Sequence, residues 1–355
     1  MKILMCCSDL SYKGGMVSVV RNYLDSGAWP ADVDITFVPT HGDGGKMAMA
    51  SRFARAWRRI RRMARAGEID VAHLHVSERG SFVRKGLLMR LLHRHGIPVV
   101  LHHHGAEFEP WYASLPEWAK RLVRSVLAEA DVNVVLSRRL VDGITSKVPG
   151  ARVEVLYNAV DVPEEPMYNP NARGILFLGR LGERKGVYDL LEALRQIDRE
   201  LPADVKVYLC GDGETDEVRR RVRDMGLVHR VAHIGWISGE EKRRILDDTM
   251  VNILPSYNEG LPMTILETMA RGIPNISTPV ASIPEVITDG VTGLMVEPGD
   301  TEGIGRALLA VATDPVMRAT LSREGHALIR ERFALPANIR KLSGIYRTLA
   351  TEPRS

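Results

Sequence analysis

Residues 250–276 read MVNILPSYNEGLPMTILETMARGIPNI, and this stretch has the pattern of a strand, a helix and a second strand. An apolar run is followed by a polar loop and then by a helical pattern that begins near Pro262. Proline suits the first helical position because its φ is fixed and it has no N–H group. Glu259 stands in the loop and Glu267 inside the expected helix. The order predicts two parallel strands joined by a crossover helix.

The same alternation extends along the whole chain. In the first half the expected helices run roughly over 16–26, 51–66, 80–95 and 116–129, with apolar runs between them. This pattern predicts parallel sheets that are buried on both faces. It restarts after 158–173, a linker rich in Pro and Asn. We therefore expect an α/β protein made of two doubly wound, Rossmann-like domains that face each other across a cleft.

Composition narrows the class of protein. Apolar residues make up 45% and charged residues 26% of the 355 residues, which is ordinary for a globular protein. No apolar run approaches the roughly 20 residues of a membrane span. Cys6, Cys7 and Cys210 match neither a disulfide framework nor zinc spacing, so we expect buried cysteines in a cytoplasmic protein.

Positive charge is concentrated in the first half. Residues 1–165 carry 23 Lys and Arg against 18 Asp and Glu, and seven arginines without an acidic residue lie within 52–65. Phe53, Trp57 and Ile60 recur there at helical spacing and should pack on the sheet. We expect the basic face to contact an anionic membrane surface. Nucleic acid is the rival partner for such a patch, and no nucleic-acid motif accompanies it.

The loops that follow the strands carry the candidate sites. Gly14 and Gly15 open the first helix, where backbone N–H groups can approach a phosphate. The segments 41–47 and 210–216 lack the full Walker and dinucleotide patterns, which argues against those cofactors. Three consecutive histidines, 102–104, invite a metal interpretation. Neighbouring residues at a strand end point different ways, however, so no metal site is expected.

The decisive loop of the second half is GRLGERKG, at 179–186, which places Arg180 and Lys185 after a strand. Together with the 256–276 stretch and the early glycine pair, it resembles retaining glycosyltransferases of family 4, which have the GT-B fold. The resemblance covers nearly the whole chain and extends to bacterial enzymes of cell-surface polysaccharide assembly. It implies an acceptor-side, membrane-facing domain and a nucleotide-sugar-binding domain. The acceptor-side domain would comprise residues 1–165 and the nucleotide-sugar-binding domain residues 166–335. A final helix over 336–355 would return to the first domain.

The resemblance also implies a donor site without a metal. Arg180, Lys185 and the start of the helix would hold the diphosphate of a nucleotide sugar. Glu259 would accept hydrogen bonds from sugar hydroxyls and Glu267 from the ribose. Arg184 is a weaker phosphate candidate beside Lys185. The remaining implied donor-binding residues are Gly14, Gly15, Gly260, Leu261, Pro262 and Met263, with Trp236 and Ile237 near the base.

In the first domain the resemblance points to the histidine loop. The family's sugar-contacting histidine matches His104, which precedes Gly105, with His103 as the alternative in the register. Glu107 would face the acceptor. His73 and His75 alternate with apolar residues and are expected to be core or cleft-lining groups. The implied reaction retains anomeric configuration by front-face attack, with no protein nucleophile.

The expected function is transfer of a mannose- or glucose-type hexose from a nucleotide-diphosphate sugar to a lipid-linked saccharide, at the inner face of the cell membrane. One alternative is a nucleotide-sugar epimerase of the same fold. Another is a non-catalytic subunit that binds a nucleotide sugar. A glycosidase would also use two carboxylates, but it would leave the Arg180 and Lys185 loop without a role.

Overall fold

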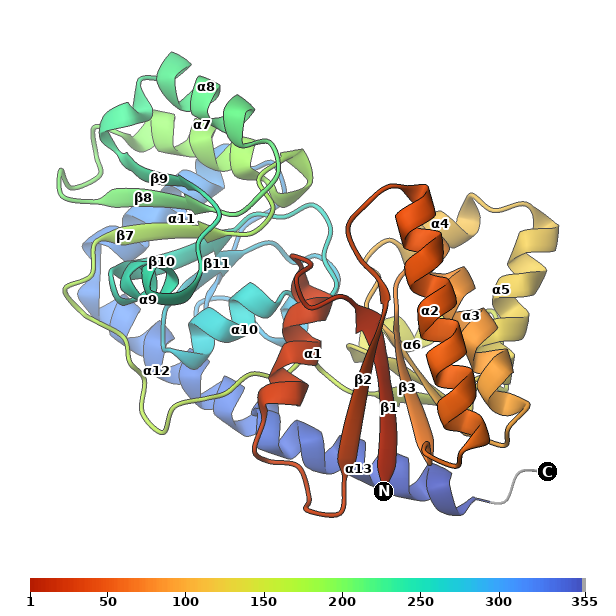
Figure 1. The fold of residues 1–355 in the computed structure, drawn as a ribbon. Coiled ribbons are helices and arrows are strands. Elements are labelled where there is room, and N and C mark those ends of the chain that lie inside the picture. Colours follow the sequence, from red (N-terminus) through yellow and green to blue (C-terminus); the bar gives the residue numbers. More distant parts are fainter. Residues whose placement is uncertain (353–355) are drawn as a thin grey trace. The chain divides into compact units, whose positions relative to one another are not determined.

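Residues 1–352 are described by a computed structural model, in which the chain forms two compact units (Figure 1). Unit 1 contains Met1–Ala159 together with the C-terminal segment from Leu335, and unit 2 contains Val160–Ala334. The sequence predicted boundaries after residues 165 and 335, and in the structure they fall after Ala159 and Ala334. The last helix, α13 (Leu335–Thr351), packs within unit 1, against α1 and β3.

Unit 1 is built on a six-stranded parallel sheet with the strand order β2-β1-β3-β4-β5-β6. Val76 and Leu101 are fully or almost fully buried, as expected for strands covered on both faces. The strands are β1 (Lys2–Ser8), β2 (Asp34–His41), β3 (Val71–Val76), β4 (Val99–His103), β5 (Val132–Val135) and β6 (Val153–Val155).

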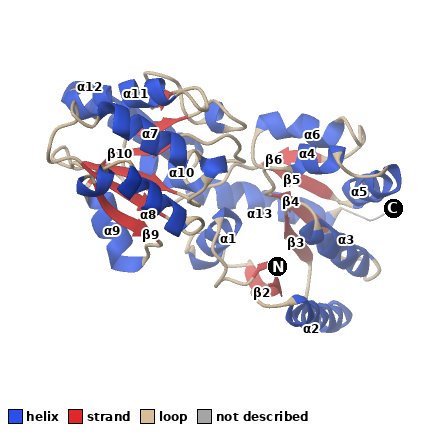
Figure 2. Ribbon diagram, turned by 90° about the horizontal axis from the view of Figure 1, so that it is seen from above, coloured by secondary structure: helices blue, strands red, loops and turns tan. Residues whose placement is uncertain are grey.

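Helices lie on both faces of this sheet (Figure 2). The face formed by α1 and α13 covers His73 and His75 of β3, and the face formed by α2, α3 and α5 covers an apolar core. The helices are α1 (Gly15–Asp25), α2 (Lys46–Arg65), α3 (Gly80–His93), α4 (Phe108–Ala113), α5 (Glu117–Glu129), η1 (Arg138–Leu140) and α6 (Val141–Thr145).

Unit 2 repeats the architecture with the strand order β12-β11-β10-β7-β8-β9, again all parallel. Its strands are β7 (Gly174–Leu178), β8 (Lys206–Cys210), β9 (Val231–Gly235), β10 (Thr249–Leu254), β11 (Asn275–Ser277) and β12 (Leu294–Met295). Its helices are η2 (Glu183–Lys185), α7 (Val187–Ile197), α8 (Thr215–Asp224), η3 (Leu227–His229), α9 (Gly239–Asp247), α10 (Met263–Ala270), η4 (Ile283–Glu285), α11 (Thr301–Thr313) and α12 (Pro315–Arg332).

The strand order reverses direction once in each sheet. In unit 2 the chain runs from β7 outward to β8 and β9, then returns to place β10 on the other side of β7. In unit 1 the corresponding neighbours are β1 and β3. The loops that leave two such strands diverge, so a crevice opens at their carboxyl ends. These two positions, between β7 and β10 and between β1 and β3, are called the switch points, and ligand sites are expected there.

Several local features differ from the sequence prediction, among them the start of α2, which begins at Lys46 and not near 51, and the unpredicted α6. Pro262 is not the first helical residue but the one before it, with an extended ψ of 121°, and α10 begins at Met263. The short helix α4 was not predicted because it is only six residues long and has no apolar periodicity. The three cysteines are buried and free, as predicted. Within residues 1–352, no helix combines the length and apolar character that crossing a bilayer requires.

Gly186 fixes the loop after β7. Its φ of +73° is in the left-handed region, and an added Cβ would run into the carbonyl oxygen of Pro255, which follows β10. We expect Gly186→Ala to lower the free energy of unfolding by at least about 3 kcal/mol, because backbone strain and a steric clash add. Chemical denaturation followed by circular dichroism measures this loss.

Gly226 provides a matched control in the same unit. It has the same φ of +73°, but an added Cβ there would meet no heavy atom within 4 Å. Gly226→Ala should therefore cost only about 1–2 kcal/mol, the strain alone. Equal losses in the two variants would contradict the proposed contact between Gly186 and Pro255.

Candidate functional site

The switch point of unit 2 brings a basic and an acidic loop together. Lys185 ends η2, after β7, and its Nζ donates a hydrogen bond to Oε1 of Glu259, in the loop after β10. The hydroxyl of Ser256 donates to the same oxygen at 2.7 Å. The Glu259 side chain is only 6% exposed and that of Lys185 is 16% exposed. A charged pair this buried keeps both groups fixed in the loops that follow β7 and β10.

Backbone groups tie the same two loops. The Tyr257 N–H donates to the Arg184 carbonyl at 3.0 Å, and Nη1 of Arg184 donates to the Asn258 carbonyl at 3.1 Å. Arg184 is thus engaged in joining the loops, a role that the sequence did not indicate. Its position beside Lys185 had suggested either a phosphate contact or a solvated loop charge.

Arg180 differs from its neighbours because it is exposed and has no hydrogen-bond or ion-pair partner within residues 1–352. It leaves the carboxyl end of β7, in the loop that also carries Lys185. A guanidinium without a protein partner is available to bind an anion. Arg180 and Lys185 therefore supply two cations at this edge of the sheet.

The start of α10 adds backbone donors. The first N–H groups of a helix have no intrahelical partner and carry its positive dipole end. Leu261 and Met263 have buried side chains, so only their backbone groups could reach a ligand. Gly260 and Pro262 complete the turn into the helix, where the Gly260 carbonyl accepts from the Ser282 N–H at 3.4 Å. The N-terminus of α10 therefore lies beside this loop, although Pro262 precedes the helix by one residue.

Glu267 has a partner that the sequence did not suggest. Its Oε2 accepts a hydrogen bond from Nζ of Lys242, on α9, at 2.7 Å. The carboxylate is 26% exposed, so it is neither fully solvated nor buried. Trp236 and Ile237 directly follow β9; Trp236 is 48% exposed, whereas Ile237 is buried. The exposed indole leaves Trp236 accessible to a ligand at this same sheet edge.

Unit 1 has a pocket of about 430 Å³ at its own switch point. Gly14 precedes α1 with a φ of +149°, Gly15 begins the helix, and both line the pocket, as expected for the glycine pair. Arg84 of α3 and Glu78 also line it, and neither was predicted from the sequence. Nε of Arg84 is buried and has no partner within residues 1–352. Burial lowers the pKa of this guanidinium below its usual value.

His104 and His103, the two candidates for the sugar-contacting histidine, have different partners in the structure. Nε2 of His104 lies 2.8 Å from Nδ1 of His75, whereas Nε2 of His103 lies 3.0 Å from Oδ1 of Asn133, on the other side of the strand. Burial lowers the pKa of His104 to about 3 and that of His103 to about 4. Both imidazoles are therefore neutral at pH 7.

Glu107 directly precedes α4, and its side chain is 45% exposed. Its N–H donates to Oε1 of Glu78 at 2.7 Å, and its carboxylate lies 3.6 Å from Nη2 of Arg79. Arg79 has a φ of +58°, a left-handed conformation that is rare outside glycine. The local structure therefore holds Glu78 and Glu107 close together after β3 and β4.

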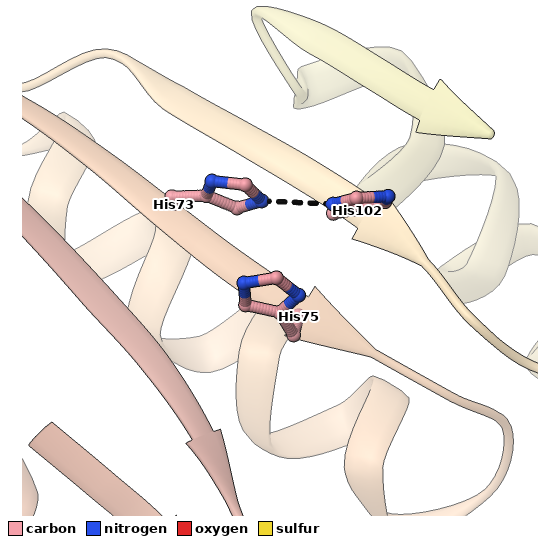
Figure 3. A group of neighbouring side chains, drawn as sticks. All are labelled: His73, His75 and His102. Carbon is pink, nitrogen blue, oxygen red and sulfur yellow. Dashed lines mark hydrogen bonds between the residues drawn. The ribbon is translucent and has the colours of Figure 1, made fainter. Parts of the chain in front are cut away.

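The expectation that no metal is bound stays a prediction, but the structure shows a histidine group other than the consecutive run 102–104. His73, His75 and His102 each offer a ring nitrogen, and these nitrogens all lie within 4.8 Å of one another (Figure 3). The three come from two adjacent strands rather than from the consecutive run 102–104. Sequence spacing alone could not reveal the group because it depends on which strands are neighbours.

The basic face of α2 is present as predicted. Ile60 is buried, and Phe53 and Trp57 pack against the core. Arg52 forms an ion pair with Asp9 at 2.6 Å. The other six arginines of 52–65 are exposed and have no hydrogen-bond or ion-pair partner within residues 1–352, and four of them border a shallow surface hollow. These six are Arg55, Arg58, Arg59, Arg61, Arg62 and Arg65.

Comparison with known proteins identifies the class. Residues 18–164 match the family model described as Glycosyltransferase Family 4, and residues 172–314 match the one described as Glycosyl transferases group 1. The chain therefore belongs to these glycosyltransferase families, as the sequence motifs predicted.

Individual proteins agree with this assignment. The lipopolysaccharide core biosynthesis glycosyltransferase LpsE of Rhizobium meliloti is 35% identical over 164 residues, which span only 46% of each chain. Sucrose-phosphate synthase from Thermosynechococcus elongatus has a similar structure, with a TM-score of 0.78, 19% identity and 98% of each chain covered. Anabaena HepE in complex with UDP gives a TM-score of 0.76 with 17% identity, covering 98% of this chain and 100% of that one. The structural matches establish the GT-B fold.

The buried pair of Lys185 and Glu259 makes a testable contribution to stability. Lys185→Met should lower the free energy of unfolding by about 2–3 kcal/mol, because it leaves the Glu259 carboxylate buried without its counter-charge. Adding Glu259→Gln should recover part of this loss. Urea denaturation of both single variants and the double variant gives the coupling energy. Simple addition of the two single losses would show that the pair is not coupled.

Proposed function

We propose that the chain is a retaining hexosyltransferase that moves a mannose- or glucose-type sugar from a nucleotide-diphosphate donor to a lipid-linked saccharide during cell-surface polysaccharide biosynthesis. The observation that carries the proposal is the meeting of Lys185 and Glu259 at the switch point of unit 2, beside unpartnered Arg180 and the start of α10. Membership of the glycosyltransferase families supports it. The UDP complex of HepE and the lipopolysaccharide role of LpsE support the donor and acceptor classes.

The cations would act on the leaving group. Glycosyl transfer breaks the bond between the anomeric carbon and a diphosphate oxygen, so negative charge develops on that oxygen. The ammonium of Lys185 has three N–H donors, and Glu259 takes one, which leaves two for the diphosphate. Arg180 can add a bidentate contact and α10 its backbone N–H groups. Such fixed donors lower the barrier because they need no reorganisation as the charge forms.

The carboxylates would hold the sugars. Glu259 keeps its second oxygen for hydroxyls of the transferred hexose, and Glu267 keeps Oε1 for the ribose because Lys242 takes Oε2. Trp236 and Ile237 would lie near the base. In unit 1 the proposal assigns Gly14 and Gly15 to the donor and Glu107 to the acceptor. His104 would contact a hydroxyl of the donor sugar through Nδ1, since Nε2 is engaged with His75.

The anomeric configuration would be retained because the acceptor attacks the same face of the sugar from which the leaving group departs. The acceptor hydroxyl bonds to the anomeric carbon while the diphosphate leaves, and the hydroxyl proton passes to the departing phosphate oxygen. No protein nucleophile and no general base are needed. We also propose that transfer requires no metal ion, because Lys185 and Arg180 provide the charge that a bound cation would otherwise supply.

The arginines of α2 would bring the enzyme to its acceptor. Six exposed guanidiniums without hydrogen-bond or ion-pair partners within residues 1–352 can each contribute about 1 kcal/mol near an anionic leaflet. The apolar side of the helix is already packed on the sheet, so the contact would be electrostatic rather than inserted. We propose a peripheral position at the inner face of the cell membrane.

The catalytic assignment is tested by turnover. UDP-, GDP- and ADP-sugars are supplied with a lipid-linked saccharide acceptor, and released nucleoside diphosphate and glycosylated product are both measured. Lys185→Ala and Glu259→Ala should each lower kcat at least about 100-fold, because each removes a contact that stabilises the developing charge. Chelation of free divalent ions should leave the rate of the folded wild-type protein unchanged.

Lys206→Ala is the matched control, because Lys206 begins β8 at the opposite edge of the same sheet and donates to the His229 carbonyl. It should keep the wild-type rate. Near-wild-type rates for Lys185→Ala and Glu259→Ala would contradict the site. Donor conversion without any acceptor would instead indicate the epimerase.

Membrane contact is tested with vesicles of anionic and neutral lipid at low salt. Changing Arg58, Arg59, Arg61 and Arg62 together to Gln should abolish most sedimentation with the anionic vesicles, because about 4 kcal/mol of attraction is lost. The control changes four arginines of α8 to Gln and removes the same charge from unit 2; these are Arg219, Arg220, Arg221 and Arg223. Equal losses from both helices would show that net charge, not the α2 face, determines binding.

A further inference from the structure

A layer of histidines is enclosed in unit 1 on the face covered by α1 and α13. In the parallel register β3 lies beside β4, with His75 opposite His102, so these side chains and that of His73 project from the same face. All three residues are 0% exposed. Figure 3 shows His73 and His102 facing each other across the two strands, with His75 beside His73 on β3.

The ring nitrogens of this layer are not all satisfied. Nε2 of His73 lies 3.0 Å from Nδ1 of His102, and Nδ1 of His75 lies 2.8 Å from Nε2 of His104. Nε2 of His75 and Nε2 of His102, however, have no partner within residues 1–352. A buried polar atom without a partner costs about 1–3 kcal/mol. Nε2 of His75 therefore keeps a lone pair that a ligand could bind.

We propose that His73, His75 and His102 bind one divalent transition-metal ion, for which Zn²⁺ is the best match. Their ligand nitrogens lie within 4.8 Å of one another. Tetrahedral zinc with Zn–N bonds of about 2.0–2.1 Å needs ligand nitrogens about 3.3 Å apart, so ring rotations would bring three of its four ligands into place. Imidazole favours zinc and its neighbours in the transition series over Ca²⁺ or Mg²⁺.

The surroundings of the cluster suit ligation. Nδ1 of His73 lies 2.5 Å from the Tyr346 hydroxyl of α13, and Nδ1 of His75 faces His104, so two of the three ligands are oriented through their other nitrogen. Burial lowers the pKa of His73 to about 3 and the pKa values of His75 and His102 well below their ordinary value. Neutral imidazoles keep the lone pairs that a metal ion requires.

The ion would have a structural role. It would join β3 to β4 and, through His75, fix the ring of His104, which lies closer to the strand end. Because all three ligands are fully buried, the ion would enter as the chain folds and would not exchange readily afterwards. This proposal is independent of the metal-free transfer chemistry, since the folded protein would keep its ion when free divalent ions are chelated.

The test uses the full chain, unfolded in guanidinium with a chelator and refolded with or without Zn²⁺. After gel filtration the zinc-refolded protein should hold one zinc per chain by mass spectrometry. Its unfolding midpoint should rise by about 5–10 °C when Zn²⁺ exceeds its dissociation constant 100-fold. Refolding with Co²⁺ should give the visible absorption of a four-coordinate cobalt site. Wild-type protein that retains no zinc would overturn the proposal and leave the layer as a hydrogen-bonded network.

Two variants distinguish zinc binding by this cluster from zinc binding by other histidines. His102→Gln should lose both the zinc and the shift in unfolding midpoint. His103→Gln is the matched control, because His103 is the adjacent residue of β4 and its ring binds Asn133 at 3.0 Å on the opposite face. It should keep one zinc per chain. Equal zinc in both variants would place the ion elsewhere and overturn the assignment. If His102→Gln does not fold, wild-type zinc content and the His103→Gln control still decide the outcome.

Discussion

The reversal of strand order in each parallel sheet is the constraint on which the rest of the structure depends. A parallel sheet needs a crossover between successive strands, and wherever two crossovers leave in opposite directions their loops must separate. In unit 2 this occurs between β7 and β10, and in unit 1 between β1 and β3. The ion pair of Lys185 and Glu259 lies at the first point and the glycine-lined pocket at the second.

At the switch point of unit 2, the ion pair of Lys185 and Glu259 contributes more to preorganisation than to stability. A buried ion pair gains little net free energy, because removing two charges from water offsets most of their attraction. Lys185 and Glu259 are nevertheless held together by Ser256, by the Arg184 contacts and by the close approach of Gly186 to Pro255. A lysine fixed in this way would suit the leaving diphosphate of the proposed reaction.

In unit 1 one strand pair serves two purposes. The inner parts of β3 and β4 form the buried histidine layer, and the end of β4 leads into the loop of His104 and Glu107. The hydrogen bond between His75 and His104 connects the layer to this loop. Tyr346 links the same layer to α13, so the final helix contributes to the environment of residues that lie far from it in the sequence.

The sequence by itself determined the α/β class, the two domains, the amphipathic phase of α2, and the order in which Arg180, Lys185, Glu259 and Glu267 occur. These features are local, because periodicity and turn residues depend only on near neighbours. Tertiary structure alone decided that Lys242 pairs with Glu267, that Arg184 joins two loops, and that histidines of β3 and β4 converge. Each depends on which helices and strands become neighbours and in what register, and no local pattern specifies that.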